Sequence, residues 1–319
     1  MNAAVAGLGL GIVSAAAFGT SGALAASLID AGWSPGAAVT ARVAIAALVL
    51  TVPAMVQLRG RSVPLRRNSG LLVMYGLLAV AGAQLCFFNA IAHVSVGVAL
   101  LLEYSAALLV VGWLWLRHGQ RPRRLTAGGG VVALGGLALV LNLTGDQHVN
   151  LPGTLWGLGA AVGLAGYFVL SAGVSAALPP LVMAWGGLAV GSVALLAAGA
   201  LGPLEMRAPQ VDVVMLDMRI SWLVPLLGLA LVAAAFAYIV GIAAARVLGA
   251  RLAAFVGLTE VLFAVAFAWL LLDQVPLPIQ LAGGVLVVAG IALVRYDELR
   301  GPPLAGQDDA LLTPRSDPR

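Results

Sequence analysis

The chain has 319 residues, of which 61% are hydrophobic and 9% are charged, and its mean hydropathy is +1.04. A soluble domain of this length carries more charge than that, so the composition excludes a water-soluble enzyme or binding domain and indicates a multi-pass membrane protein. The net charge of +4 does not point to nucleic acid, because the basic residues are all arginine and gather in short loops. We therefore expect the lipid bilayer as the partner of the chain, and the oligomeric state stays open.

Several enzyme chemistries lack the residues that they need. The single cysteine, Cys86, excludes an internal disulfide. The histidines lie at segment ends or in turns (His93, His118 and His148), and no aspartate lies in the middle of an apolar segment. Intramembrane proteolysis by a Ser–His or Asp–Asp pair is therefore not indicated, and the chain has no P-loop signature and no metal-ligand cluster. We expect no enzyme, no cofactor and no metal.

Taken in order, the chain contains ten apolar segments. About 20 residues suffice to cross the hydrocarbon core of a bilayer. The segments are about Ala4–Ile29, Pro35–Gln57, Gly70–Ala92, Ser95–Leu116, Leu125–Leu143, Gly153–Ala177, Leu181–Leu201, Ser221–Ala245, Leu252–Leu272 and Ile279–Val294. Residues 297–319 are rich in proline, aspartate and arginine, which predicts a disordered tail. The expected fold is an all-α membrane protein with ten transmembrane helices.

Two of these segments each carry one carboxylate, Glu103 and Glu260, about a third of the way along. An ionised carboxylate inside the membrane costs several kcal/mol unless it is paired, protonated or faces water. Two such acids at matching depth indicate either a cavity that binds a cationic amine or a proton, or structural bonds to neighbouring helices.

The segments that carry these acids belong to a longer internal repeat. Gly129–Leu141 (GGVVALGGLALVL) and Gly283–Arg295 (GGVLVVAGIALVR) share their first three residues and an Ala-Leu-Val near the end. Their offset is 283 − 129 = 154 residues, and the glutamates are offset by 260 − 103 = 157. Repeats of this kind are typical of secondary transporters. The sequence therefore predicts two five-helix repeats, residues 1–148 and 149–296.

Arginine placement predicts the orientation of the helices. With the amino terminus in the cytoplasm, 14 arginines of the loops and the tail fall inside and only Arg207 and Arg219 fall outside. We therefore expect a multi-pass protein of the cell (inner) membrane with both termini cytoplasmic. Because five helices per repeat is an odd number, the second repeat runs in the opposite direction, and the repeat is inverted.

Several motifs resemble those of a known superfamily. Ten helices in an inverted five-plus-five repeat resemble the drug/metabolite transporters, and within them the EamA-type transporters. The likeness covers nearly the whole chain and is carried by Ala17–Gly22 (AFGTSG), Ala41–Val43 (ARV), Ser95–Leu116, Gly129–Leu141 and Arg251–Arg295. The triplet Leu102-Glu103-Tyr104 looks most like the branch that exports threonine and homoserine. The resemblance implies a metabolite exporter.

Other polar and aromatic residues within the segments are candidates for a substrate or coupling site. Arg42 has three interpretations: contact with a substrate carboxylate, a structural pair with Glu103 or Glu260, which we prefer, or a side chain that extends to the outer face. Tyr104 adjoins Glu103. The remaining candidates are two aromatics, Tyr167 and Trp185, and one amide, Asn89. Aromatics in membrane helices commonly pack or anchor at the interface, and the amide is expected to bond between helices.

The function favoured by the sequence is secondary active transport, as an exporter of amino acids or similar small metabolites by alternating access, with possible proton coupling. A channel or facilitator for small solutes and broad-specificity drug efflux are the alternatives. The duplicated halves favour alternating access over a channel.

Overall fold

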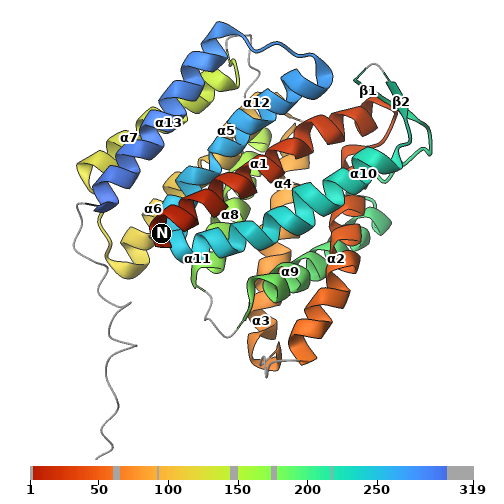
Figure 1. The fold of residues 1–319 in the computed structure, drawn as a ribbon, viewed down its shortest axis with the longest axis horizontal. Helices are drawn as coiled ribbons and strands as arrows, with labels where there is room; N and C mark the ends of the chain where they lie inside the picture. The colour runs from red at the N-terminus through yellow and green to blue at the C-terminus, as the bar shows by residue number, and fades with distance from the viewer. Residues whose placement is uncertain are drawn as a thin grey trace, which may run out of the picture.

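The structure is a computed structural model, and it describes residues 3–59, 65–91, 93–143, 150–173, 178–216 and 218–299. These residues are nearly all helical (Figure 1). Eight helices are long and apolar enough to cross a membrane, and two shorter apolar helices, Arg124–Val140 and Thr259–Leu271, accompany them. The multi-pass helical class predicted from composition is therefore confirmed.

The elements follow in chain order. The part before residue 144 comprises α1 (Ala3–Asp30), α2 (Pro35–Arg59), α3 (Leu65–Tyr75), η1 (Gly76–Gly82), α4 (Ala83–Ile91), α5 (Val96–Tyr104), α6 (Ala106–His118) and α7 (Arg124–Val140). The later part comprises α8 (Leu151–Gly173), α9 (Pro180–Ala200), β1 (Val213–Met215), β2 (Met218–Ile220), α10 (Leu223–Ala230), η2 (Leu231–Phe236), α11 (Ala237–Gly257), α12 (Thr259–Leu272) and α13 (Pro278–Leu299).

Two of the long helical runs contain a π-helical stretch. η1 lies between α3 and α4, and η2 lies between α10 and α11, each within an otherwise continuous helix. A π-helical turn adds a residue to the helix and commonly marks a functional site. η1 packs on α8 and α9, whereas η2 packs on α1 and α2. The same irregularity therefore occurs once in each half of the chain.

The two segments with a carboxylate differ from the continuous helices expected from the sequence. Ser105 separates α5 from α6, and Leu258 separates α11 from α12. The Ser105 hydroxyl donates to the carbonyl of Leu102 at 2.6 Å, and the Thr259 hydroxyl donates to the carbonyl of Val256 at 2.7 Å. Side-chain bonds of this kind compete with the helical ladder and bend helices. Each helix is thus interrupted within two residues of its glutamate.

The connection between the eighth and ninth segments also differs from the expected loop. Arg246 and Arg251 both lie inside α11, which is kinked at Gly249 (φ 77°, ψ 160°). Only glycine adopts this backbone conformation without strain, so the two segments are joined by a kink at this single residue instead of by a loop.

The long loop after α9 contains a short hairpin that the all-helical expectation omitted. β1 and β2 pair antiparallel, with Val213 opposite Ile220 and Met215 opposite Met218. The loop is fixed to the turn between α1 and α2: the Trp33 Nε1 donates to the carbonyl of Pro209 at 2.8 Å. The hairpin therefore lies at the end of the bundle opposite the N-terminus (Figure 1).

Helices α7 and α13 lie side by side at the edge of the molecule (Figure 1). Their contact is made by glycines: a Cβ on Gly136 would lie 2.6 Å from the carbonyl oxygen of Gly283, and one on Gly290 would lie 2.5 Å from that of Gly129. Small residues let membrane helices approach this closely. The glycine-rich repeat thus serves as a helix–helix interface.

α13 continues to Leu299, so the first residues of the expected disordered tail are helical. Asp297 is buried and accepts from the backbone N–H and the hydroxyl of Thr126 at the start of α7. This bond explains the longer helix, because it satisfies a free backbone donor at the α7 amino end. Residues 300–319 lie outside the described residues.

Candidate functional site

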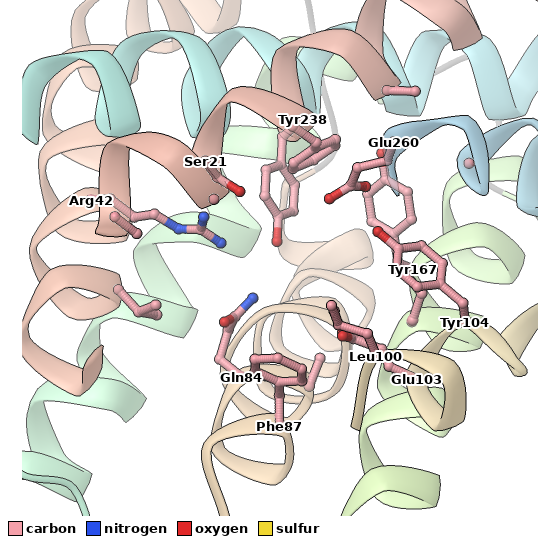
Figure 2. Close-up of a pocket in the computed structure, with 18 of the residues that line it drawn as sticks. Ser21, Arg42, Gln84, Phe87, Leu100, Glu103, Tyr104, Tyr167, Tyr238 and Glu260 are labelled. Atoms are coloured by element: carbon pink, nitrogen blue, oxygen red, sulfur yellow. The ribbon is translucent and has the colours of Figure 1, made fainter. Parts of the chain in front are cut away.

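A cavity of about 560 Å³ lies between the helices of the bundle, bounded by α1, α2, α4, α5, α8, α11 and α12 (Figure 2). At one end its lining reaches Asp30, Pro35 and Ile91, near the turn that holds the hairpin loop. On α1 the lining extends from Asp30 back to Gly11. Ile29 and Asp30 at the hairpin end of the lining are exposed, whereas Ser14, Ala244 and Ala253 at the other end are buried, so the cavity opens toward the hairpin end.

One side of the cavity carries both carboxylates. Glu103 comes from the last turn of α5 and Glu260 from the first turn of α12, beside the two helix interruptions. The two side chains are close enough to interact electrostatically, and the Tyr104 hydroxyl lies close to the Glu260 carboxylate. Both glutamates are half-buried and face the cavity. Their charge is thus accessible from the cavity, which is the arrangement that makes a carboxylate tolerable at this depth.

Arg42 lies on the other side of the cavity, on α2. Its side chain points into the cavity toward Gln84 and Tyr238, and the two glutamates lie on the far side of the cavity (Figure 2). The residue is only 9% exposed, and its Nε has no hydrogen-bond partner. In the described part of the chain, the ion pairs join Arg207 to Glu205 and Arg295 to Glu298, and neither involves Arg42. The structural pair preferred from the sequence is therefore not formed, and the side chain does not extend to the outer face.

Aromatic rings form the wall between the two charged sides. The ring centroids of Tyr167 and Tyr238 are 5.6 Å apart at nearly a right angle, and Phe18 lies 5.2 Å from Tyr238. The Tyr167 hydroxyl reaches the backbone of α11 at Gly241, where a Cβ would collide with it. Edge-to-face packing fixes these rings, so their faces and hydroxyls are held in place around the cavity.

The other residues expected at the site lie elsewhere. Trp185 donates through Nε1 to the Thr51 hydroxyl at 3.0 Å and joins α9 to α2, outside the cavity lining. Asn89 donates to the carbonyl of Leu85 within its own helix, instead of bonding between helices, and does not line the cavity. Of the expected residues, the structure brings together Glu103, Glu260, Tyr104, Arg42 and Tyr167.

Three lining residues were not among the site residues expected from the sequence, and of these Gln84 was expected to bond between helices and Tyr238 to pack or anchor at the interface. Tyr238 and Gln84 point into the cavity beside Arg42, and Phe87 lies next to Gln84 (Figure 2). Gln84 is a polar residue within an apolar segment, and this is a signal in the sequence that can indicate a cavity-lining residue. An aromatic such as Phe87 gives no such signal. His148 lies outside the described residues.

This arrangement of charges defines what the cavity can bind. A guanidinium and two carboxylates face one space from opposite sides, with aromatic rings between them. An unpaired buried charge is costly, so a ligand that supplies an anion to Arg42 and a cation to the glutamates is favoured. No cluster of three or more His, Cys, Asp or Glu side chains suited to a metal occurs among the described residues.

A bundle of helices long and apolar enough to cross a membrane, around a cavity that holds charged side chains, is the arrangement expected of a membrane transport protein. The sequence profile of the EamA-like transporter family matches residues 5–142 and 151–296, and the chain belongs to this family.

Two further likenesses accompany the family match. The "Uncharacterized transporter YwfM" of Bacillus subtilis (strain 168) is 28% identical over 110 residues, which are 34% of this chain and 37% of that protein. The chain thus matches little more than a third of this relative's length. A solved structure described only as "Crystal structure of protein" has a TM-score of 0.75 at 18% identity and covers 93% of this chain and 99% of that one, a likeness of fold alone.

Proposed function

We propose that this EamA-family protein is a secondary active transporter that exports amino acids or similar small zwitterionic metabolites by alternating access. The observation that carries the proposal is the separation of charge across one cavity, with Arg42 on α2 opposite Glu103 and Glu260 on α5 and α12. The carboxylate of an amino acid matches Arg42, and its ammonium matches the glutamates and the tyrosine faces.

An inverted repeat is supported by features that occur once in each half. η1 and η2 interrupt corresponding helices, and Ser105 and Leu258 interrupt the two helices that carry glutamates. The contacts between the halves also correspond: α1 of the first half packs on α11 and α12 of the second half, while α8 of the second half packs on α4 and α5 of the first half. Two such halves can exchange their conformations, which moves the opening of a central cavity from one side to the other.

The arginine distribution supports an inner-membrane protein with both termini cytoplasmic. In that orientation the hairpin end is external, and the cavity of this structure faces outward. A reporter fused after Arg67 or Arg121 is then cytoplasmic, and one within residues 202–220 is external. External labelling of a cysteine placed at Arg66 contradicts this topology.

Coupling to protons is assigned to the glutamates. A carboxylate that faces a cavity of alternating access takes up a proton on one side and releases it on the other. The helix interruptions beside Glu103 and Glu260 place both acids where the helices bend. The triplet Leu102-Glu103-Tyr104 supports threonine and homoserine as the first substrates to test.

Broad-specificity drug efflux is the second candidate, favoured by the aromatic lining of Phe18, Phe87, Phe88, Tyr167 and Tyr238. Arg42 argues against lipophilic cations as the main substrates, because a fixed positive charge in the same cavity repels them.

The decisive experiment is counterflow in proteoliposomes. Vesicles loaded with unlabelled threonine should transiently accumulate labelled threonine above its external concentration, and Arg42→Gln should reduce this exchange at least tenfold. The surface variant Arg207→Gln is the control, because Arg207 lies in the exposed ion pair with Glu205. Flux without exchange indicates a channel. Exchange of lipophilic cations but of no amino acid indicates drug efflux.

A further inference from the structure

A second group of polar side chains, two of them buried and one half-buried, lies outside the cavity lining. Tyr75 ends α3, Ser171 lies on α8 and Arg246 lies on α11. Arg246 is one residue from Val247, which contacts Gly7 near the start of α1. The group therefore lies on the N-terminal side of the central cavity, where the helices are packed together.

The polar atoms of this group are poorly satisfied. Tyr75 and Ser171 are completely buried and their hydroxyls adjoin each other, yet neither oxygen makes a hydrogen bond of good geometry. Arg246 interacts electrostatically with Tyr75, and its Nε has no partner. Its Nη2 contacts the Met183 sulfur at 3.6 Å, which is a weak acceptor. Three donors on three helices thus converge with no anion between them in the described part of the chain.

The internal repeat relates this group to the open mouth of the cavity. α2 and α9 begin at Pro35 and Pro180, an offset of 180 − 35 = 145, which relates Ser171 to Ala26. η1 and η2 begin at Gly76 and Leu231, an offset of 231 − 76 = 155, which relates Arg246 to Ile91.

Ala26 and Ile91 both line the open end of the cavity. The second offset also relates Tyr75 to Ala230, which adjoins the lining residue Leu229. When the two halves exchange conformations, the counterparts of the present mouth residues line the mouth on the other side.

We propose that Arg246, with the hydroxyls of Tyr75 and Ser171, forms a second anion-binding subsite that holds the substrate carboxylate when the cavity opens on the N-terminal side. This inference rests on the proposed function and deepens it. The guanidinium supplies the charge-assisted hydrogen bonds that a carboxylate accepts, and the two hydroxyls supply further donors. Here the helices are closed, so Met183 and the ring of Tyr75, which packs on Gly187, occupy the space.

The subsite connects to the central cavity through aromatic rings. The ring centroids of Tyr75 and Tyr167 are 6.1 Å apart, and Tyr167 lines the cavity. An amino acid moving from the N-terminal side would thus pass from Arg246 along Tyr75 and Tyr167 to Arg42. The mouth on the hairpin side has Ile91 in place of an arginine, so the two openings differ in their affinity for an anion.

The first test measures half-saturating threonine concentrations on each side, in inside-out and right-side-out membrane vesicles. Arg246→Gln should raise the value on the N-terminal side at least tenfold and leave the other side within twofold, and Arg246→Lys should give an intermediate value. Arg251→Gln is the matched control, because Arg251 lies on the same helix but contacts Gln120 at 3.3 Å. Equal changes on both sides, or none, overturn the subsite.

Anionic lipid is the other source of a ligand for Arg246. The Arg246→Gln effect should persist in liposomes of phosphatidylcholine alone. Its loss in those vesicles assigns the arginine to lipid phosphates and overturns the proposal.

The second test does not depend on threonine as the substrate. In a Cys86→Ala background, Ser171→Cys should react with a membrane-impermeant maleimide from the N-terminal side, and Ala26→Cys should react from the hairpin side. Conditions that increase one reaction should decrease the other. If Ser171→Cys never reacts, the subsite is excluded. If it reacts while wild-type protein transports no threonine, the proposed substrate fails but the opening stands.

Discussion

Two adjacent glycines on α7 test the packing that holds α7 against α13. Gly136 is buried, and a Cβ added there would lie 2.6 Å from the Gly283 carbonyl oxygen and 2.7 Å from the Cβ of Leu286. Gly135 is exposed, and a Cβ there would meet nothing within 4 Å. The variants Gly136→Ala and Gly135→Ala therefore change the same helix by the same group, and only the first changes the contact with α13.

The expected cost follows from the geometry. Ordinary contacts need about 3.5 Å, so Gly136→Ala must separate the helices by roughly 0.9 Å, and a gap of that size removes a quarter to a half of each neighbouring contact. Overpacking of this kind costs about 1–3 kcal/mol. Gly135→Ala should change the stability by less than about 0.5 kcal/mol.

Thermal unfolding of the purified protein in detergent measures this difference. Gly136→Ala should lower the apparent melting temperature by roughly 2–12 °C, on a scale of about 2–4 °C per kcal/mol for chains of this order of size. Gly135→Ala should remain within about 2 °C of the wild type on the same scale. Equal shifts for the two variants would refute the close glycine contact between α7 and α13.

Three further predictions concern single side chains. Glu260→Gln keeps the shape of the side chain but cannot bind or release a proton, so it should abolish substrate accumulation driven by a proton gradient. The control variant Glu205→Gln, in the exposed loop, should leave this accumulation unchanged. Full proton-driven transport by Glu260→Gln would make this acid structural. Trp185→Phe removes the hydrogen bond to Thr51 and should lower stability by about 1 kcal/mol without changing threonine affinity, and a loss of affinity would place Trp185 at the site. Asp297→Ala removes the bonds to the α7 amino end and should cost about 1–2 kcal/mol in thermal unfolding, and an unchanged melting temperature would exclude a stabilising cap.

Much of the architecture follows from local properties of the sequence. Because unpaired backbone groups and charges are costly in lipid, a long apolar segment predicts a membrane-spanning helix. Eight of the helices are long and apolar enough to cross a membrane. The shared glycine pattern of Gly129–Leu141 and Gly283–Arg295 also has a structural counterpart, because these are the residues that bring α7 and α13 together.

Local irregularities were harder to predict. Ser105 and Thr259 are residue types that also occur in uninterrupted membrane helices, and their effect depends on whether the hydroxyl donates to a backbone carbonyl of the preceding turn. The kink at Gly249 occurs at one of 40 glycines in the chain, and composition does not single it out. The β1–β2 hairpin is three residues per strand, too short for a period-two pattern.

The sequence by itself determined that this protein lies in the membrane. It also marked Glu103, Glu260 and Arg42 as charges that need an explanation, because transferring a charge into lipid is costly at any position in the chain. The tertiary structure alone decided how those charges are arranged. Arg42 faces the glutamates across a cavity and pairs with neither, and Tyr238 and Gln84 complete the lining from helices distant in the sequence. The side of a helix that meets a cavity depends on how neighbouring helices pack, and in segments that are apolar all round no periodicity records it.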